Sequence, residues 1–99
     1  MHIAKTVNEE ETVLAVEGRI DVTNSKMLQD AIISAFQSTT NLVVDFEKVV
    51  YIASAGLRAL LLGQKTAVSK SGMMKLIHVC DDVMEVLRMT GFQSALHIE

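Results

Sequence analysis

The segment Ala53-Ser54-Ala55-Gly56-Leu57 contains the side chain best placed to do chemistry, the hydroxyl of Ser54. Before it, the β-branched run at residues 41–46 predicts a buried strand, and residues 47–50 are expected to form a turn. After it, apolar residues recur at helical spacing, at Leu57, Leu60, Leu61 and Val68. We therefore expect Ser54 to be the N-cap of an amphipathic helix, with its oxygen facing amides that have no intrahelical partner.

Catalysis is one use for such a hydroxyl, and the sequence disfavours it. Ser54, His78 and Asp45 are the residue types of a hydrolase triad, but the glycine pattern G-x-S-x-G is absent around Ser54. No histidine or cysteine cluster has metal-ligand spacing, and neither a P-loop nor a dinucleotide-binding glycine motif is present. We therefore expect a protein that is not an enzyme, with no catalytic residue, no metal site and no cofactor-binding residue.

The composition indicates one globular domain over residues 1–99 and excludes several classes of function. The chain has 99 residues, 49% hydrophobic and 21% charged, which is enough for a single core. A net charge of -3 and scattered basic residues disfavour nucleic-acid binding. No stretch approaches the ~20 apolar residues of a membrane span, and no signal peptide is recognisable. We therefore expect a cytoplasmic protein without membrane insertion. Its single cysteine, Cys80, cannot form an internal disulfide, which fits a reducing compartment.

The N-terminal half is predicted to contain a hairpin followed by a helix. Residues 3–7 and 12–17 flank a charged turn, which is typical of two antiparallel strands. From about residue 24 to 36, apolar side chains occupy one face of a helix, namely Leu28, Ala31, Ile32 and Ala35. Thr23 or Asn24 is expected to cap this helix.

The C-terminal half continues with alternating helices and strands. After the helix that begins near Ser54, residues 73–79 predict a strand, and a third helix ends near Gly91. A short strand at residues 95–98 closes the domain. The order β-β-α-β-α-β-α-β predicts an α/β fold with a mixed, mostly parallel sheet packed against three main helices.

Three motifs are similar to those of a known family. Gly18-Arg19-Ile20-Asp21 resembles G-x-[IL]-D, and Met89-Thr90-Gly91-Phe92 resembles M-[ST]-G-[LF]. Residues 45–57 resemble D-[LF]-x-x-V-x-[YF]-[IM]-[DS]-S-[ST/A]-G-L. Over essentially its whole length, the chain resembles the STAS domain in the form of the bacterial anti-sigma factor antagonists. It differs from the best-known members at Ala53, where they often have an acidic residue, and at Ala55, where they have Ser or Thr.

This resemblance implies a partner-switching protein in transcription regulation. In such proteins, the serine at the position of Ser54 accepts phosphate from an anti-sigma factor that is also a GHKL-type serine kinase. That kinase would bind the ATP. The unphosphorylated form binds the kinase and so frees a sigma factor, and a PP2C-type phosphatase restores it. The resemblance therefore implies that Ser54 is a phosphoacceptor.

The expected position of Ser54 is also physically suited to a phosphate. Free amides and the positive end of the helix dipole stabilise an anion at a helix N-terminus. Phosphorylation would add about -1.5 to -2 charges and three acceptor oxygens to the surface. A docked partner would have to desolvate or match that charge, so we expect its affinity to change while the fold stays intact.

The surface around Ser54 is the expected docking site. The predicted partner-binding residues are Ala53, Ala55, Gly56, Leu57, Arg58 and Asp21. Several positions also have a purely structural interpretation: Ser54 as a helix cap, Gly56 as relief of crowding and Leu57 as core. For Asp21 the structural interpretation is favoured, in which it caps the first helix and orders its turn. Asp45 is expected to hydrogen-bond loop amides beneath Ser54 and so to position it.

A second class of interaction protein competes with this interpretation. STAS-like domains also serve as cytoplasmic subunits of lipid-handling ABC transporters and as parts of larger signalling assemblies. Both would dock through the same surface at the helix start. A gene neighbour encoding a serine kinase or a sigma factor would favour the first interpretation, and a transporter permease or ATPase would favour the second. A small-ligand sensor, the third class, would require an apolar pocket.

Overall fold

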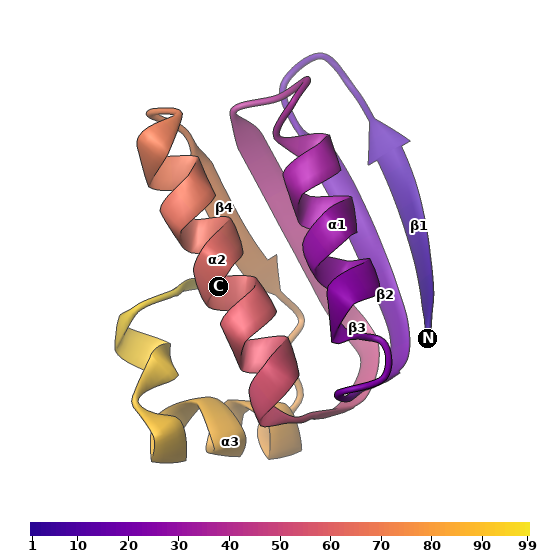
Figure 1. Cartoon of the computed structure of the whole chain (residues 1–99), viewed down its shortest axis with the longest axis vertical. Helices are drawn as coiled ribbons and strands as arrows, with labels where there is room; N and C mark the ends of the chain where they lie inside the picture. Colours follow the sequence, from indigo (N-terminus) through magenta and orange to yellow (C-terminus); the bar gives the residue numbers. More distant parts are fainter.

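A computed structural model describes residues 1–99 and shows a five-stranded sheet with two helices against one face (Figure 1). The elements in chain order are β1 (His2–Val7), β2 (Thr12–Ile20), α1 (Ser25–Ala35), β3 (Asn41–Ile52), α2 (Ser54–Ser69), β4 (Met73–Ile77), α3 (Asp81–Thr90), the short 3-10 helix η1 (Phe92–Ser94) and β5 (His97–Ile98). The strand order is β1-β2-β3-β4-β5, with β1 antiparallel to β2 and all other neighbours parallel. This confirms the predicted α/β fold and its mixed, mostly parallel sheet.

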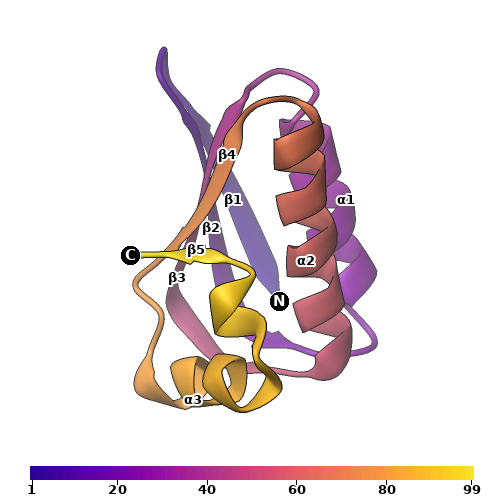
Figure 2. The same ribbon diagram turned by 90° about the vertical axis from the view of Figure 1, so that its left-hand side faces the viewer.

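The core lies between the sheet and helices α1 and α2, and α3 lies at the carboxyl end of the parallel strands (Figure 2). Alternate residues of β2 point into this core, and the buried residues of α1 are spaced by three or four positions. The largest fully buried side chains include Leu14, Ile20, Leu28, Ile32, Phe46, Ile52 and Leu60. No helix has both the length and the apolar character needed to cross a membrane.

Strand β3 is longer than the sequence predicts. The expected turn at residues 47–50 is wrong, because β3 runs without interruption to Ile52. Two register shifts against β2, between Ala15 and Glu17 and between Gly18 and Arg19, each give β3 one extra residue. Such bulges let a strand bend while it stays paired. The polar residues that favoured a turn therefore lie on the exposed side of a bulged strand.

Candidate functional site

Ser54 is the first residue of α2 and lies at the carboxyl end of the sheet (Figure 1). The N-cap is Ala53, which has an extended backbone (φ -98°, ψ 172°) and whose carbonyl accepts from the N–H groups of Gly56 (2.9 Å) and Leu57 (3.1 Å). The prediction that Ser54 itself is the cap is therefore wrong by one residue. The N–H of Ala53 donates to the carbonyl of Ile20 (2.8 Å), which holds Ala53 extended and starts the helix directly after it.

The hydroxyl of Ser54 is exposed and takes part in no hydrogen bond within the chain. The backbone N–H groups of Ser54 and Ala55 also have no acceptor, and the first turn of α2 contains no acidic residue. The hydroxyl is therefore free to act as a phosphate acceptor. The unpaired amides beside it and the dipole of α2 would stabilise the product.

Two of the predicted partner-binding residues, Gly56 and Leu57, are buried beneath the start of α2. A Cβ atom on Gly56 would lie 2.6 Å from Cγ2 of Ile20 and 2.8 Å from Cγ1 of Ile52. Only glycine lets the first turn of α2 approach the ends of β2 and β3 this closely. The structure thus supports the packing interpretation of both residues and brings neither to the surface.

Asp21 lies in the loop between β2 and α1, directly after Ile20, whose carbonyl binds the N-cap of α2. Its Oδ1 accepts hydrogen bonds from the hydroxyl (2.6 Å) and the N–H (3.0 Å) of Thr23. These bonds, that of the hydroxyl foremost, hold the pKa of Asp21 below its ordinary value. Asn24 is the N-cap residue of α1, as predicted, but its side-chain oxygen accepts from the N–H of Asp21 (2.9 Å) and not from an amide of the helix. Asp21 therefore orders this loop and remains ionised beside the start of α2.

The exposed part of the predicted site is smaller than the sequence indicates. Ser54 and Arg58 are exposed, one helical turn apart on α2, and Ala53, Ala55 and Asp21 are half-buried. We call these five residues the α2-start surface. Its centre consists of small side chains, which leave the Ser54 hydroxyl open to close approach.

Asp45 does not belong to the α2-start surface. It lies in the middle of β3, where its Oδ1 accepts the N–H of Glu47 (2.9 Å) and lies 2.9 Å from Nδ1 of His78. The prediction that Asp45 binds loop amides beneath Ser54 is wrong, because β3 continues for seven residues beyond it to Ile52. Asp45 instead stabilises the bulge in β3 through its hydrogen bond with Glu47, and it contacts His78 in the segment that follows β4.

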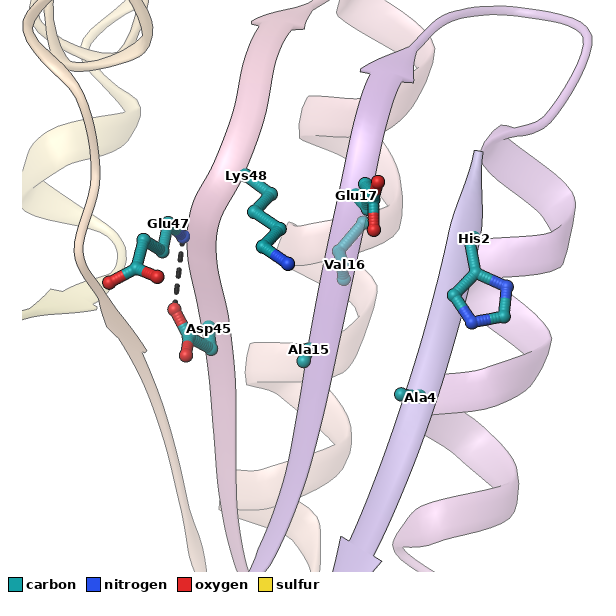
Figure 3. Close-up of a pocket in the computed structure, with 8 residues that line it drawn as sticks. All are labelled: His2, Ala4, Ala15, Val16, Glu17, Asp45, Glu47 and Lys48. Atoms are coloured by element: carbon teal, nitrogen blue, oxygen red, sulfur yellow. Dashed lines mark hydrogen bonds between the residues drawn. The ribbon is translucent and has the colours of Figure 1, made fainter.

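The face of the sheet opposite α1 and α2 carries a shallow furrow of about 420 Å³, which Figure 3 shows. It is lined by residues of β1, β2 and β3, namely His2, Ala4, Ala15, Val16, Glu17, Asp45, Glu47 and Lys48. Charges of both signs surround its small apolar floor. Most of the residues that line the furrow are polar or charged, unlike those of the apolar pocket that a small-ligand sensor would require.

The family of the chain follows from its sequence as well as its fold. Residues 3–97 match the model of a family described as "Mlab, STAS domain". The chain belongs to this STAS-domain family. The STAS domain expected from the three motifs is thereby confirmed.

Several solved proteins share the STAS fold of this chain. An anti-sigma factor antagonist from Mycobacterium paratuberculosis has a TM-score of 0.85 and 20% identity, covering 98% of this chain and 83% of that one. The Bacillus cell fate determinant SpoIIAA in its phosphorylated form has a TM-score of 0.75 and 19% identity, over 99% and 91%. A sulfate transporter family protein from Wolinella succinogenes has a TM-score of 0.80 and 18% identity, over 95% and 80%. No curated protein sequence matches the chain.

Within this STAS domain, the pairing of His78 with Asp45 is the contact that sequence reasoning missed. Asp45 lies opposite Ile77 in the parallel ladder of β3 and β4, so the next residue after β4 reaches it. The strand alignment could have revealed this pair once β3 and β4 were placed side by side. Of the three residue types of a hydrolase triad, the structure joins His78 to Asp45, and no hydrogen bond joins either to Ser54.

The His78–Asp45 pair should make stability depend on pH. The hydrogen bond to Asp45 raises the pKa of His78 above its ordinary value of 6.5, so protonated His78 stabilises the fold below that pH. This contribution is lost as the pH rises through the raised pKa. In urea unfolding, the parent should therefore be more stable at about pH 5.5 than at about pH 8, and His78→Asn should reduce the difference.

Asparagine is the appropriate replacement for this test, because the backbone of His78 is left-handed (φ 57°) and asparagine tolerates that conformation. Asp45→Asn should reduce the difference in the same way, since it removes the charge that the imidazolium faces. An unchanged pH dependence in both variants would contradict the assignment.

Proposed function

We propose that this STAS domain is an anti-sigma factor antagonist, a cytoplasmic partner-switching protein that catalyses no reaction itself. In its unphosphorylated form it binds an anti-sigma factor that is also a GHKL-type serine kinase, and this binding frees a sigma factor. The kinase, which holds the ATP, then transfers phosphate to Ser54 and the complex dissociates. A PP2C-type phosphatase removes the phosphate and restores the binding form.

The observation that carries this proposal is the state of the Ser54 hydroxyl. It is exposed, unbonded and placed on the first residue of α2, next to two backbone N–H groups that have no acceptor. A hydroxyl used for capping would have to break its own hydrogen bond before it could react. Two proteins of the same fold add support, since one is named an anti-sigma factor antagonist and another was solved in a phosphorylated form.

The α2-start surface can act as a switch without a change of fold. Gly56 packs the first turn of α2 tightly against Ile20 and Ile52, so the backbone around Ser54 is held by the core. Before modification, the small residues Ala53 and Ala55 leave room for a partner to contact this turn closely. After modification, about two negative charges occupy the same place and must be desolvated or matched by the partner.

A second candidate is favoured by the description of the matching family. That family is described as "Mlab, STAS domain", and the resemblance to STAS domains implies, as the alternative, a cytoplasmic subunit of a lipid-handling ABC transporter. One protein of the same fold also belongs to a sulfate transporter family. In this case the α2-start surface would bind a transporter subunit, and Ser54 would be a docking residue.

Affinity capture separates the two candidates. A Ser54→Ala bait, which cannot be phosphorylated, should retain its partner from a lysate of the source cell, and mass spectrometry identifies what is captured. Recovery of a GHKL-type kinase, followed by a phosphate mass shift on Ser54 in the parent but not in the variant, would support the antagonist function. Recovery of a permease or transporter ATPase would contradict it and support the second candidate.

A further inference from the structure

Arg58 is the cation placed to meet a phosphate on Ser54. The two residues are four positions apart on α2, so their side chains lie on the same helix face, about 6 Å apart along the axis. Both are exposed. Long side chains in a helix lean toward its N-terminus, so the guanidinium of Arg58 can reach the turn that carries Ser54.

Arg58 also has no interaction partner within the chain, unlike several other cationic side chains. Lys26, Lys75 and Arg88 each form an ion pair with a carboxylate. Arg19 lies over the ring of Tyr51, at 4.3 Å from its centroid. Arg58 forms no hydrogen bond and no ion pair, so it is free to bind an anion that appears nearby.

A phosphate on Ser54 would need such a counter-ion. The neighbouring Asp21 is held ionised by its hydrogen bonds from Thr23, and its charge would repel a phosphate. The first turn of α2 offers two unpaired N–H groups but contains no lysine or histidine. Arg58 can add two parallel N–H donors, because a guanidinium binds phosphate oxygens in a bidentate manner.

We propose that Arg58 is the intramolecular counter-ion of phosphorylated Ser54 and, before phosphorylation, a docking residue for an acidic group of the partner. This inference rests on the proposed function in taking Ser54 as the phosphoacceptor. Phosphorylation then acts twice on the same surface. It adds negative charge at Ser54, and it withdraws from the partner the one free cation of the α2-start surface.

The pairing is tested with phosphoserine placed at position 54 during translation, which requires no kinase. The phosphate is titrated with pH by ³¹P NMR in the parent and in Arg58→Ala, Arg58→Lys and Lys65→Ala backgrounds. Pairing with Arg58 favours the dianion, so R58A should raise the proton affinity of the phosphate by about 2-fold. R58K should lie between the parent and R58A, because an ammonium lacks the bidentate geometry.

Lys65 provides the matched control. It is exposed on the same helix and face as Ser54, but 11 residues further along, roughly 16 Å away and beyond a Debye length. K65A should therefore titrate as the parent does. The proposal is overturned if R58A also titrates as the parent, or if K65A changes the titration as much as R58A.

Different results would contradict the proposed function and the inference about Arg58. If no kinase phosphorylates Ser54 but the NMR titration depends on Arg58, the proposed function is wrong while the pairing holds. If Ser54 is phosphorylated in the cell but R58A changes neither the titration nor the affinity of the unphosphorylated form for the captured kinase, the inference about Arg58 is wrong. In the latter case the proposed function stands.

Discussion

Replacing Ser54 with aspartate should weaken binding of the captured kinase by about 100-fold or more, whereas Ser54→Ala should bind as the unphosphorylated parent does. The hydroxyl makes no hydrogen bond in the free protein, so its removal leaves no polar group of this chain unpaired. A carboxylate at the same place must lose water in the interface, and it would pair with Arg58 and so occupy the cation that the unphosphorylated form offers to its partner. Isothermal titration calorimetry on the three purified proteins measures the difference directly.

A charge elsewhere on α2 provides the control for this result. Ser69 is the last residue of α2 and is exposed, so Ser69→Asp adds the same charge at the opposite end of the helix. It should leave binding nearly unchanged, and the far-ultraviolet circular dichroism of S54D should match that of the parent. Equal affinities of S54A and S54D would rule out Ser54 as a switch, even with the fold intact.

Replacing Gly56 with alanine should lower the free energy of unfolding by about 1–3 kcal/mol, the usual effect of overpacking a core. The new Cβ would lie 2.6 Å from Cγ2 of Ile20 and 2.8 Å from Cγ1 of Ile52, closer than carbon atoms approach without strain. Either α2 moves away from the sheet or the isoleucines leave their preferred rotamers. Urea unfolding of the parent and G56A measures the loss.

Two further variants distinguish crowding from a general effect of alanine. Ile20→Ala removes the nearer of the atoms that the new Cβ would meet, so the I20A/G56A double variant should lose less stability than the sum of the single variants. Gly91→Ala places a Cβ where no atom lies within 4 Å, at a left-handed residue (φ 80°), and should cost about 1 kcal/mol through backbone strain alone. Strict additivity of I20A and G56A would contradict the packing role of Gly56.

The chain order of strands and helices was predictable because it depends on local pattern. Apolar residues at spacings of two or of three to four mark which face of each element is buried, and this pattern needs no knowledge of distant residues. The hairpin, the helix that carries Leu28 and Ile32, and the start of α2 near Ser54 all follow from it. The motif around Ser54 likewise predicted the family.

The tertiary structure alone decided how that motif is presented. Residues 47–50 look like a turn in isolation, but Lys48 and Val49 pair with Glu17 and Gly18 of β2, and this pairing extends β3 to Ile52. The hydrogen bond from Ala53 to Ile20 then makes Ala53 the cap and leaves the Ser54 hydroxyl free. Both depend on partners more than 25 residues away along the chain, which no local pattern reports.

The roles of the acidic residues Asp21 and Asp45 likewise depend on contacts between residues that are distant in the sequence. By itself, the sequence determined an α/β STAS domain with a serine at the start of a helix and Arg58 one turn further on. Only the folded chain placed Asp21 beside that serine. It also placed Asp45 on the face of the sheet opposite α1 and α2, where it contacts His78. Propensity and periodicity act between near neighbours, whereas the pairing of a side chain depends on which strands lie together in space.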